Sequence, residues 1–340
     1  MPMTQRPVSR PPLGTIESAS REAPGELGTL LLPPVSDAAS IAPPKPLRSY
    51  TPPGPLPRIE ALYVLTYHSH HIAGADYATN DHVALAVDLP VIDAAGYRIV
   101  PLAELLDLFL AMQRNESIDP REWRVVALTF DDGPEYDAVD HHHPSLGVQP
   151  SFLRILDDFA SRTRQTAVCG TSFVIASPAA RRCMEAATGP GPYYLHEGAL
   201  NDDWWLAAID SGRLAIANHS WDHLHPGLPR VAHSRQVKGD FTSVDNAADA
   251  DLQIDAATRF IDRRTGGRAA PFFAYPFGQY SRYLVEEYFP RTPSSHGLRA
   301  AFTVDARPLR VTENRWSLPR YSCGYNWSSP GELAQLLANA

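Results

Sequence analysis

The sequence predicts an α/β fold with a mostly parallel sheet. Short apolar runs of strand length alternate with segments whose apolar residues recur at helical spacing. One run, residues 125–130 (VVALTF), is apolar throughout, as expected for a strand covered on both faces. The polar residues that could do chemistry come just after such runs. A β/α barrel and a doubly wound open sheet both place their sites at the strand ends, so this pattern leaves both architectures open.

The expected elements of the first half begin with a β-prone apolar run that predicts a strand at 61–68. A further segment, 83–97, ends at Gly96. Helical spacing after Pro101 predicts a helix at 102–112. The same criteria then predict, in order, a strand at 125–130, a helix at 152–159 and a strand at 171–175.

The second half continues the alternation. A helix at 204–209 is stopped near Gly212, and a strand at 214–217 leads into a histidine-rich motif. The remaining elements are a helix at 251–261, a strand at 272–275, a helix at 283–288, and strands at 300–304 and 317–322.

Proline divides the chain into two regions. Of the 32 prolines, 14 lie within residues 1–57. Proline removes a backbone donor and fixes φ, so this region predicts a largely irregular, extended N-terminal arm without catalytic residues. Residues 58–340 are expected to form the folded domain.

Composition excludes several classes of protein. The net charge of −8 argues against a nucleic-acid partner, which needs a basic surface. Three cysteines without close spacing argue against a disulfide framework or a thiolate zinc site. There is no apolar stretch of membrane-spanning length, and residues 1–14 lack the apolar core of a secretion signal, which favours a cytoplasmic location. The sequence does not specify an oligomeric state.

Two polar motifs indicate metal chemistry. Asp131 and Asp132 end one apolar run, and His219 and His223 follow another. Two imidazoles and one carboxylate suit a catalytic zinc site with a position left for water, while the second carboxylate could act as a base. The histidine spacing of four predicts that both rings lie on one side of a helical turn. Alone, an Asp-Asp-Gly sequence is most often a turn and such a histidine pair a surface feature; their occurrence at successive strand ends favours a site.

These residues resemble the polysaccharide deacetylases among the carbohydrate esterases. Thr129–Gly133 (TFDDG) is similar to the first family motif, His219–His223 (HSWDH) to the second, and Phe273–Gly278 (FAYPFG) to the third, over roughly residues 60–323. The resemblance implies a distorted, TIM-like β/α barrel for residues 58–340. It also implies hydrolysis of N-acetyl groups on an N-acetylhexosamine-containing glycan, and a location at the cell envelope or outside the cell.

The resemblance also implies a role for each site residue. Asp132, His219 and His223 would hold one divalent ion, expected to be zinc, with cobalt, nickel or manganese as alternatives. Asp131 would be the base for attack by metal-bound water. The main-chain N–H of Phe277 would stabilise the oxyanion, and Tyr275 in the same motif would line the groove.

The chain departs from the family pattern at two places. The third motif of the family often carries an arginine that orients the base, whereas this chain has Ala274; Arg320 is the expected replacement. The family's C-terminal Leu-x-His, which supplies the acid, is missing. However, residues 65–69 (LTYHS) resemble the N-terminal strand of the biofilm poly-N-acetylglucosamine deacetylases, whose barrel order is permuted, and this makes His68 the expected general acid.

Two other functions remain open at the level of sequence. One is an amide or ester hydrolase on a small acyl substrate, since the segments around 134–150 and 186–203 could close the groove. The other is a glycan-binding relative without catalysis. The missing motif arginine favours this second reading, and the intact acidic and histidine residues oppose it.

Overall fold

The computed structural model describes residues 62–114, 116, 124–187 and 191–338. The predicted arm, residues 1–57, lies outside these ranges, so it stays a prediction. Within them, no helix is both long and apolar enough to cross a membrane.

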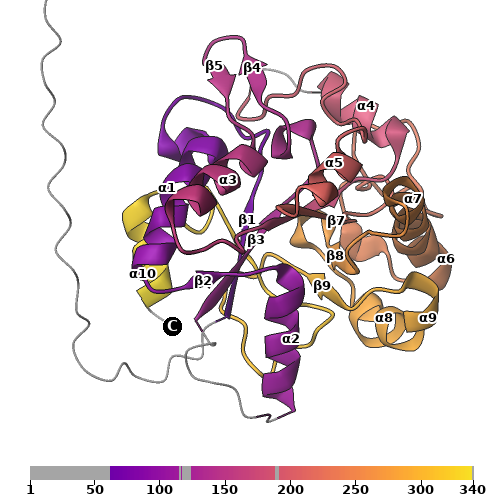
Figure 1. Cartoon of the computed structure of the whole chain (residues 1–340). Coiled ribbons are helices and arrows are strands. Elements are labelled where there is room, and N and C mark those ends of the chain that lie inside the picture. The colour runs from indigo at the N-terminus through magenta and orange to yellow at the C-terminus, as the bar shows by residue number, and fades with distance from the viewer. Residues whose placement is uncertain (1–61, 115, 117–123, 188–190, 339–340) are drawn as a thin grey trace, which may run out of the picture. The chain divides into compact units, whose positions relative to one another are not determined.

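One curled sheet organises the domain (Figure 1). Its hydrogen-bonded path runs through seven strands, every neighbouring pair parallel, in the order β10 (Tyr321–Ser322), β1 (Leu62–Tyr67), β3 (Val125–Phe130), β6 (Gly170–Val174), β7 (Leu214–Asn218), β8 (Phe272–Ala274) and β9 (Ala300–Phe302). The two-residue β2 (Arg98–Ile99) pairs with the first residues of β3.

The segment before β10 brings the two edges of the sheet together. Leu318 forms a parallel bridge with Phe302 of β9, and three residues later Tyr321 pairs with Leu65 of β1. The sheet therefore curls into a distorted β/α barrel, which confirms the architecture that the family resemblance implied.

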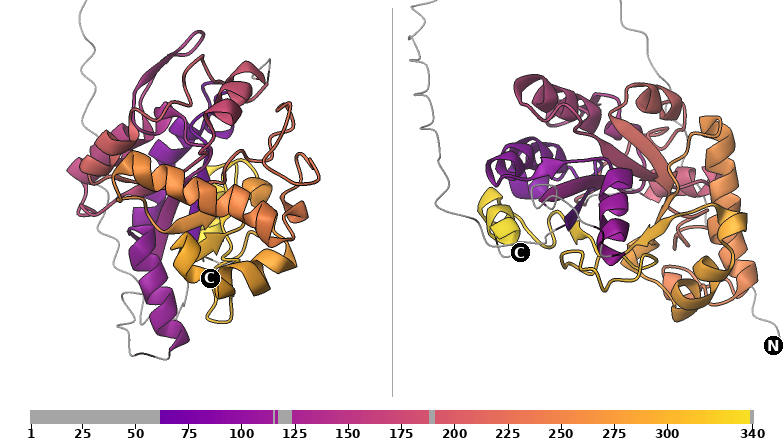
Figure 2. Two further views of the ribbon diagram at one scale, coloured as in Figure 1. Left: turned by 90° about the vertical axis from the view of Figure 1, so that its right-hand side faces the viewer. Right: turned by 60° about the horizontal axis from the view of Figure 1, so that its bottom comes forward.

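Helices surround this sheet on its outer side (Figure 2). They are α1 (Asp81–Ala94), α3 (Phe152–Arg162), α4 (Pro178–Ala187), α5 (Trp205–Asp210), α6 (Ala247–Ala250), α7 (Ala256–Thr265), α8 (Phe289–Arg291), α9 (Pro293–His296) and α10 (Pro330–Ala338), with π-helical turns at Asp251–Asp255 and Leu284–Tyr288. Local sequence signals explain where some of these helices begin or end. The Asn80 side chain accepts from His82 N–H and Val83 N–H at the start of α1, and α7 ends at Gly266, whose φ is +63°.

The barrel interior is closed at its amino-terminal end by α2 (Leu102–Gln113), which lies at the lower end of the sheet in Figure 1. Leu105, Leu106 and Phe109 of this helix are fully buried with the first apolar residues of the strands, such as Leu62 and Val125. Because apolar side chains fill this end, only the opposite end of the barrel can hold a polar site.

Side chains alternate strictly between this interior and the outer helical layer. In β8, Phe272 and Ala274 belong to the interior core, whereas Phe273 packs with the outer helices. Strands of a parallel sheet covered on both faces are expected to behave this way. The alternation decides which side chain at each strand end faces the barrel mouth.

Nearly all elements expected from the sequence are present, within a few residues at their ends. The unassigned segment 83–97 is mostly α1, and the polar loop around 141–149 contains an antiparallel hairpin of β4 (His141–His143) and β5 (Gly147–Gln149). The expected elements did not include β2, α4, α6, α8, α9 or α10.

Candidate active site

Three strands each deliver one polar side chain to the mouth of the barrel. Every second residue of each strand faces the barrel interior. Two residues after the last such position of β1, β3 and β7 stand His68, Asp131 and His219, respectively. All three line one cavity of about 790 Å³, together with Asp132, His223 and Phe277. The structure thus gathers residues that are far apart in the sequence.

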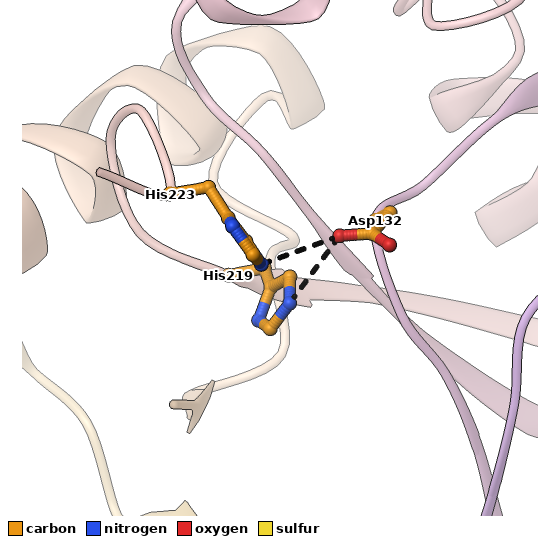
Figure 3. A group of neighbouring side chains, drawn as sticks. All are labelled: Asp132, His219 and His223. Atoms are coloured by element: carbon orange, nitrogen blue, oxygen red, sulfur yellow. Dashed lines mark ion pairs between the residues drawn. The ribbon is translucent and has the colours of Figure 1, made fainter. Parts of the chain in front are cut away.

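Asp132, His219 and His223 converge on one point (Figure 3). The Oδ1 atom of Asp132 lies 3.6 Å from Nε2 of His219 and 3.5 Å from Nε2 of His223. One potential ligand atom from each side chain lies within 4.8 Å of the others, and all three residues are buried or nearly so. The geometry is that of three ligands around one small cation.

The backbone reaches this arrangement through left-handed conformations. Asp132 has φ of +72°, Ser220 +74° and His223 +58°, all uncommon for non-glycine residues. Residues 219–223 therefore form an irregular loop, and the prediction of a helical turn at this pair was wrong. The loop is held by the Asn218 side chain, which accepts from Ser220 N–H and donates to Ile254 O.

The donor set fits a divalent metal of the zinc type. His219 Nδ1 lies 2.9 Å from the carbonyl oxygen of Ala274, so this nitrogen carries the proton and Nε2 keeps its lone pair for an ion. Asp132 Oδ1 is buried and has no hydrogen-bond partner. A buried carboxylate oxygen without a donor is costly unless a cation satisfies it.

Burial and charge set the protonation states that a metal ligand needs. Burial would raise the pKa of Asp132, but the neighbouring imidazoles outweigh it and hold this pKa below its usual range. Burial lowers the pKa of His223 to about 3, so its imidazole is neutral near pH 7. The free carboxylate and the neutral ring are the forms that bind metal.

Asp131 is held apart from these ligands by Arg320. The fully buried guanidinium donates from Nη1 to Oδ1 of Asp131 at 2.7 Å and from Nη2 to Oδ2 at 2.8 Å. The arginine is itself oriented by Thr129 Oγ1 at 3.2 Å and Thr303 O at 3.0 Å. Burial alone would raise the pKa of Asp131, yet the Arg320 charge outweighs it and this pKa is lowered, which keeps the carboxylate ionised.

His68 directly follows β1 and lines the same cavity. Its backbone N–H donates to Asp81 Oδ2 at 2.8 Å, and the other oxygen of Asp81 lies 2.7 Å from His71 Nδ1. The polypeptide turn that carries His68 is therefore anchored to the start of α1, while its ring lines the cavity.

Two of the aromatic residues of the third motif, Phe277 and Tyr275, differ in position. Phe277, with φ of +58°, presents a 44% exposed ring to the cavity, and its centroid lies 4.3 Å from that of His223. Tyr275 does not line the groove, and that expectation was wrong. It is 1% exposed, packs with the outer helical layer on the same face as Phe273, and donates its hydroxyl to Trp316 O at 2.7 Å.

The cavity residues that the sequence did not indicate include His70, Tyr193 and Tyr325. His70 Nε2 lies 3.5 Å from Asp132 Oδ2, and its buried Nδ1 has no partner. A second histidine two residues after His68 repeats the strand alternation and could have indicated His70. No sequence motif marks either tyrosine.

The family model described as polysaccharide deacetylase matches residues 119–289, which is half of the chain. No curated protein matches.

Solved structures share the fold at low sequence identity. A deacetylase from Streptococcus pyogenes, PplD, solved in complex with acetate, is 16% identical with a TM-score of 0.50, and the match covers 82% of this chain and 98% of that one. IcaB from Ammonifex degensii is 17% identical with a TM-score of 0.50, over 82% and 97%. BA0330 from Bacillus anthracis is 12% identical with a TM-score of 0.52, over 82% and 69%. By the family match, the chain belongs to the polysaccharide deacetylase family.

Proposed function

We propose that this protein is a metal-dependent hydrolase that removes N-acetyl groups from a glycan containing N-acetylhexosamine. The observation that carries the proposal is the convergence of Asp132, His219 and His223 at the barrel mouth, beside a separately held carboxylate, Asp131. Family membership supports deacetylation as the reaction and a glycan as the substrate.

Asp132, His219 and His223 would hold the ion. Their nitrogen and oxygen donors suit zinc best, with cobalt, nickel or manganese as alternatives. When bound, the metal supplies a Lewis acid for the acetyl carbonyl and lowers the pKa of water to about 7.

Asp131 would accept the proton of the attacking water. Arg320 keeps this carboxylate ionised and fixes its plane, because both of its oxygens accept from one planar guanidinium. Each carboxylate oxygen has a second lone pair, so the ion pair leaves room for a proton on the cavity side.

His68 would protonate the departing amine. Amide cleavage needs this step because an amine is a poor leaving group, and positioned acids typically contribute about 10²–10⁴ in rate. The main-chain N–H of Phe277 is proposed to stabilise the oxyanion, an effect of about 10²–10³ per donor. Tyr275 has no part in this mechanism.

Acetate release from N-acetylglucosamine oligomers by metal-loaded protein tests the proposal. Asp131→Asn should keep metal and lose most turnover, whereas Asp132→Ala should lose both. The exposed His142→Ala on the β4–β5 hairpin is a matched control that should keep metal and turnover. Unchanged acetate release by Asp131→Asn would exclude it as the base, and glycan binding without acetate release would favour a non-catalytic relative.

A second candidate is the hydrolysis of a small acyl amide or ester. It is favoured by the wall that residues after 190 build over the cavity, where Pro192 O accepts from Ile72 N–H at 2.9 Å and Tyr194 N–H donates to His70 O at 2.8 Å. A substrate series from acetylated monosaccharide to oligomer separates the two. Faster turnover of the smallest substrates would favour the second.

A further inference from the structure

Two tyrosines form a wall of the cavity to which the proposed chemistry assigns no role. Tyr325 is 76% exposed, which is unusual for a large aromatic residue without a partner surface, and Tyr193 is 38% exposed. Both line the cavity that holds the candidate metal ligands. Burial, followed by the interaction with the Tyr325 side chain, raises the pKa of Tyr193 above its ordinary range.

One ring, that of His70, lies between the candidate metal ligands and the two tyrosines. His70 Nε2 lies 3.5 Å from Asp132 Oδ2, and the Tyr193 ring lies over His70 with 5.0 Å between centroids at a tilt of 31°. Tyr325 follows at the rim. Exposure rises along this series from 5% at His70 to 38% and 76%, so the series leads from the buried centre to solvent.

Both tyrosines are mounted on firmly held backbone. The strand-like contact between residues 70–72 and 192–194 places Tyr193 beside the end of β1. Tyr325 sits in a tight turn directly after β10, where Asn326 N–H donates to Ser322 O at 2.9 Å and Ser322 N–H donates to Asn326 Oδ1 at 2.6 Å. Because the backbone is already held in place, binding of a ligand should cost little conformational entropy of the backbone.

We propose that Tyr193 and Tyr325 form a subsite for the pyranose ring next to the residue whose acetyl group is removed. This inference rests on the proposed function, since it places the acetylated sugar between the metal ligands and Phe277. The C–H face of a pyranose is apolar and packs on an aromatic face, while hydroxyl groups at the ring edge can bond to the phenols. The protein should therefore prefer a chain of hexosamines to a single residue.

The test compares a short N-acetylglucosamine oligomer with a small aryl acetate. In wild-type protein the ratio of their kcat/KM values measures the contribution of sugar contacts beyond the scissile group. Tyr325→Ala and Tyr193→Ala should each lower this ratio about tenfold, mainly through a higher KM for the oligomer. Tyr325→Phe, which keeps the ring, should retain most of it. Val148→Ala, an exposed apolar residue on the β4–β5 hairpin, is the control for loss of surface area.

A binding measurement keeps the subsite testable if the chemistry proves different. Metal-free protein, stripped with a chelator, is titrated with the oligomer by calorimetry. The wild-type protein should bind, and both alanine variants should bind about tenfold more weakly. Failure of the proposed function would appear as no acetate release by wild-type protein from the oligomer. The subsite is overturned by unchanged ratios and affinities in the alanine variants, or by a wild-type protein that does not bind the oligomer.

Discussion

Arg320 and Asp131 form a bidentate ion pair in which both partners are buried, with N–O distances of 2.7 and 2.8 Å. Asp131 follows β3, and Arg320 precedes β10, two strands that flank β1 on opposite sides. The arginine thus reaches Asp131 from the segment that closes the barrel, and residue 274 in the third motif is an uncharged alanine.

Removing the arginine should damage both stability and turnover. Arg320→Met leaves the buried Asp131 without its counter-charge, which typically costs about 3–5 kcal/mol of unfolding free energy. Denaturant unfolding measures this loss. Arg310→Met, an exposed arginine on the same connecting segment, should change stability by less than about 0.5 kcal/mol.

The conservative variant separates orientation from folding. Arg320→Lys keeps the charge but cannot donate to both carboxylate oxygens in one plane. It should recover part of the stability and still lower kcat at unchanged metal content. Full turnover in Arg320→Lys would show that the charge alone matters and that the fork geometry has no role.

Replacement of His68 should depend on the leaving group. His68→Ala should slow amide hydrolysis by about 10²–10⁴, since the amine must be protonated to depart. An activated aryl acetate has a leaving group that needs no proton, so its hydrolysis should fall far less. Steady-state rates on both substrates decide the point; equal losses would assign His68 to binding or folding instead of proton donation.

Metal should stabilise the protein through the three ligands. At a free metal concentration of about 100 times Kd, ligand binding adds about 2.7 kcal/mol to the unfolding free energy. Thermal unfolding with and without zinc should therefore show a rise in Tm for wild-type protein and for His142→Ala, but little for His223→Ala. A rise of equal size in His223→Ala would place the ion elsewhere.

A buried carboxyl group outside the candidate site, that of Asp88, should make the unfolding free energy depend on pH. Asp88 of α1 accepts hydrogen bonds from Tyr67 and Tyr77 hydroxyls and from Trp327 Nε1, yet burial raises its pKa from 3.8 to about 6. The folded state therefore holds this proton more tightly than the unfolded state. Its contribution to stability is fully present below about pH 4 and declines as the pH rises to about 6.

Comparison with an uncharged variant isolates that contribution. The difference in unfolding free energy between wild-type protein and Asp88→Asn should shift by at most about 3 kcal/mol between pH 4 and pH 6.5, with wild-type protein relatively more stable at the acid end. Chemical denaturation at several pH values measures it. A pH-independent difference would mean that Asp88 titrates alike in both states.

The alternation of side chains explains which expectations could be made from the sequence. The apolar runs at β1, β3 and β7 are long enough for their ends to be found, and the polar residues just beyond them face the mouth because of that alternation. Applied to β8, the same rule would have placed Tyr275 on the outer face with Phe273. Its place in the third motif suggested the groove instead, and was the less reliable criterion.

Other features depend on contacts that leave no local pattern. The loop 219–223 is not helical because Asn218 and neighbouring residues hold Ser220 and His223 at positive φ. β2 is two residues long, below any periodic signal. Tyr193 and Tyr325 line one cavity because residues 192–194 pair with residues 70–72, which follow β1, and because β10, which precedes Tyr325, pairs with β1.

The most direct test of the account is an anomalous-scattering map of crystals grown with zinc. We expect one strong peak within ligand distance of Asp132 Oδ1, His219 Nε2 and His223 Nε2, with both oxygens of Asp131 outside it and still paired with Arg320. A peak bound by Asp131, or a site elsewhere with these three side chains unliganded, would contradict it.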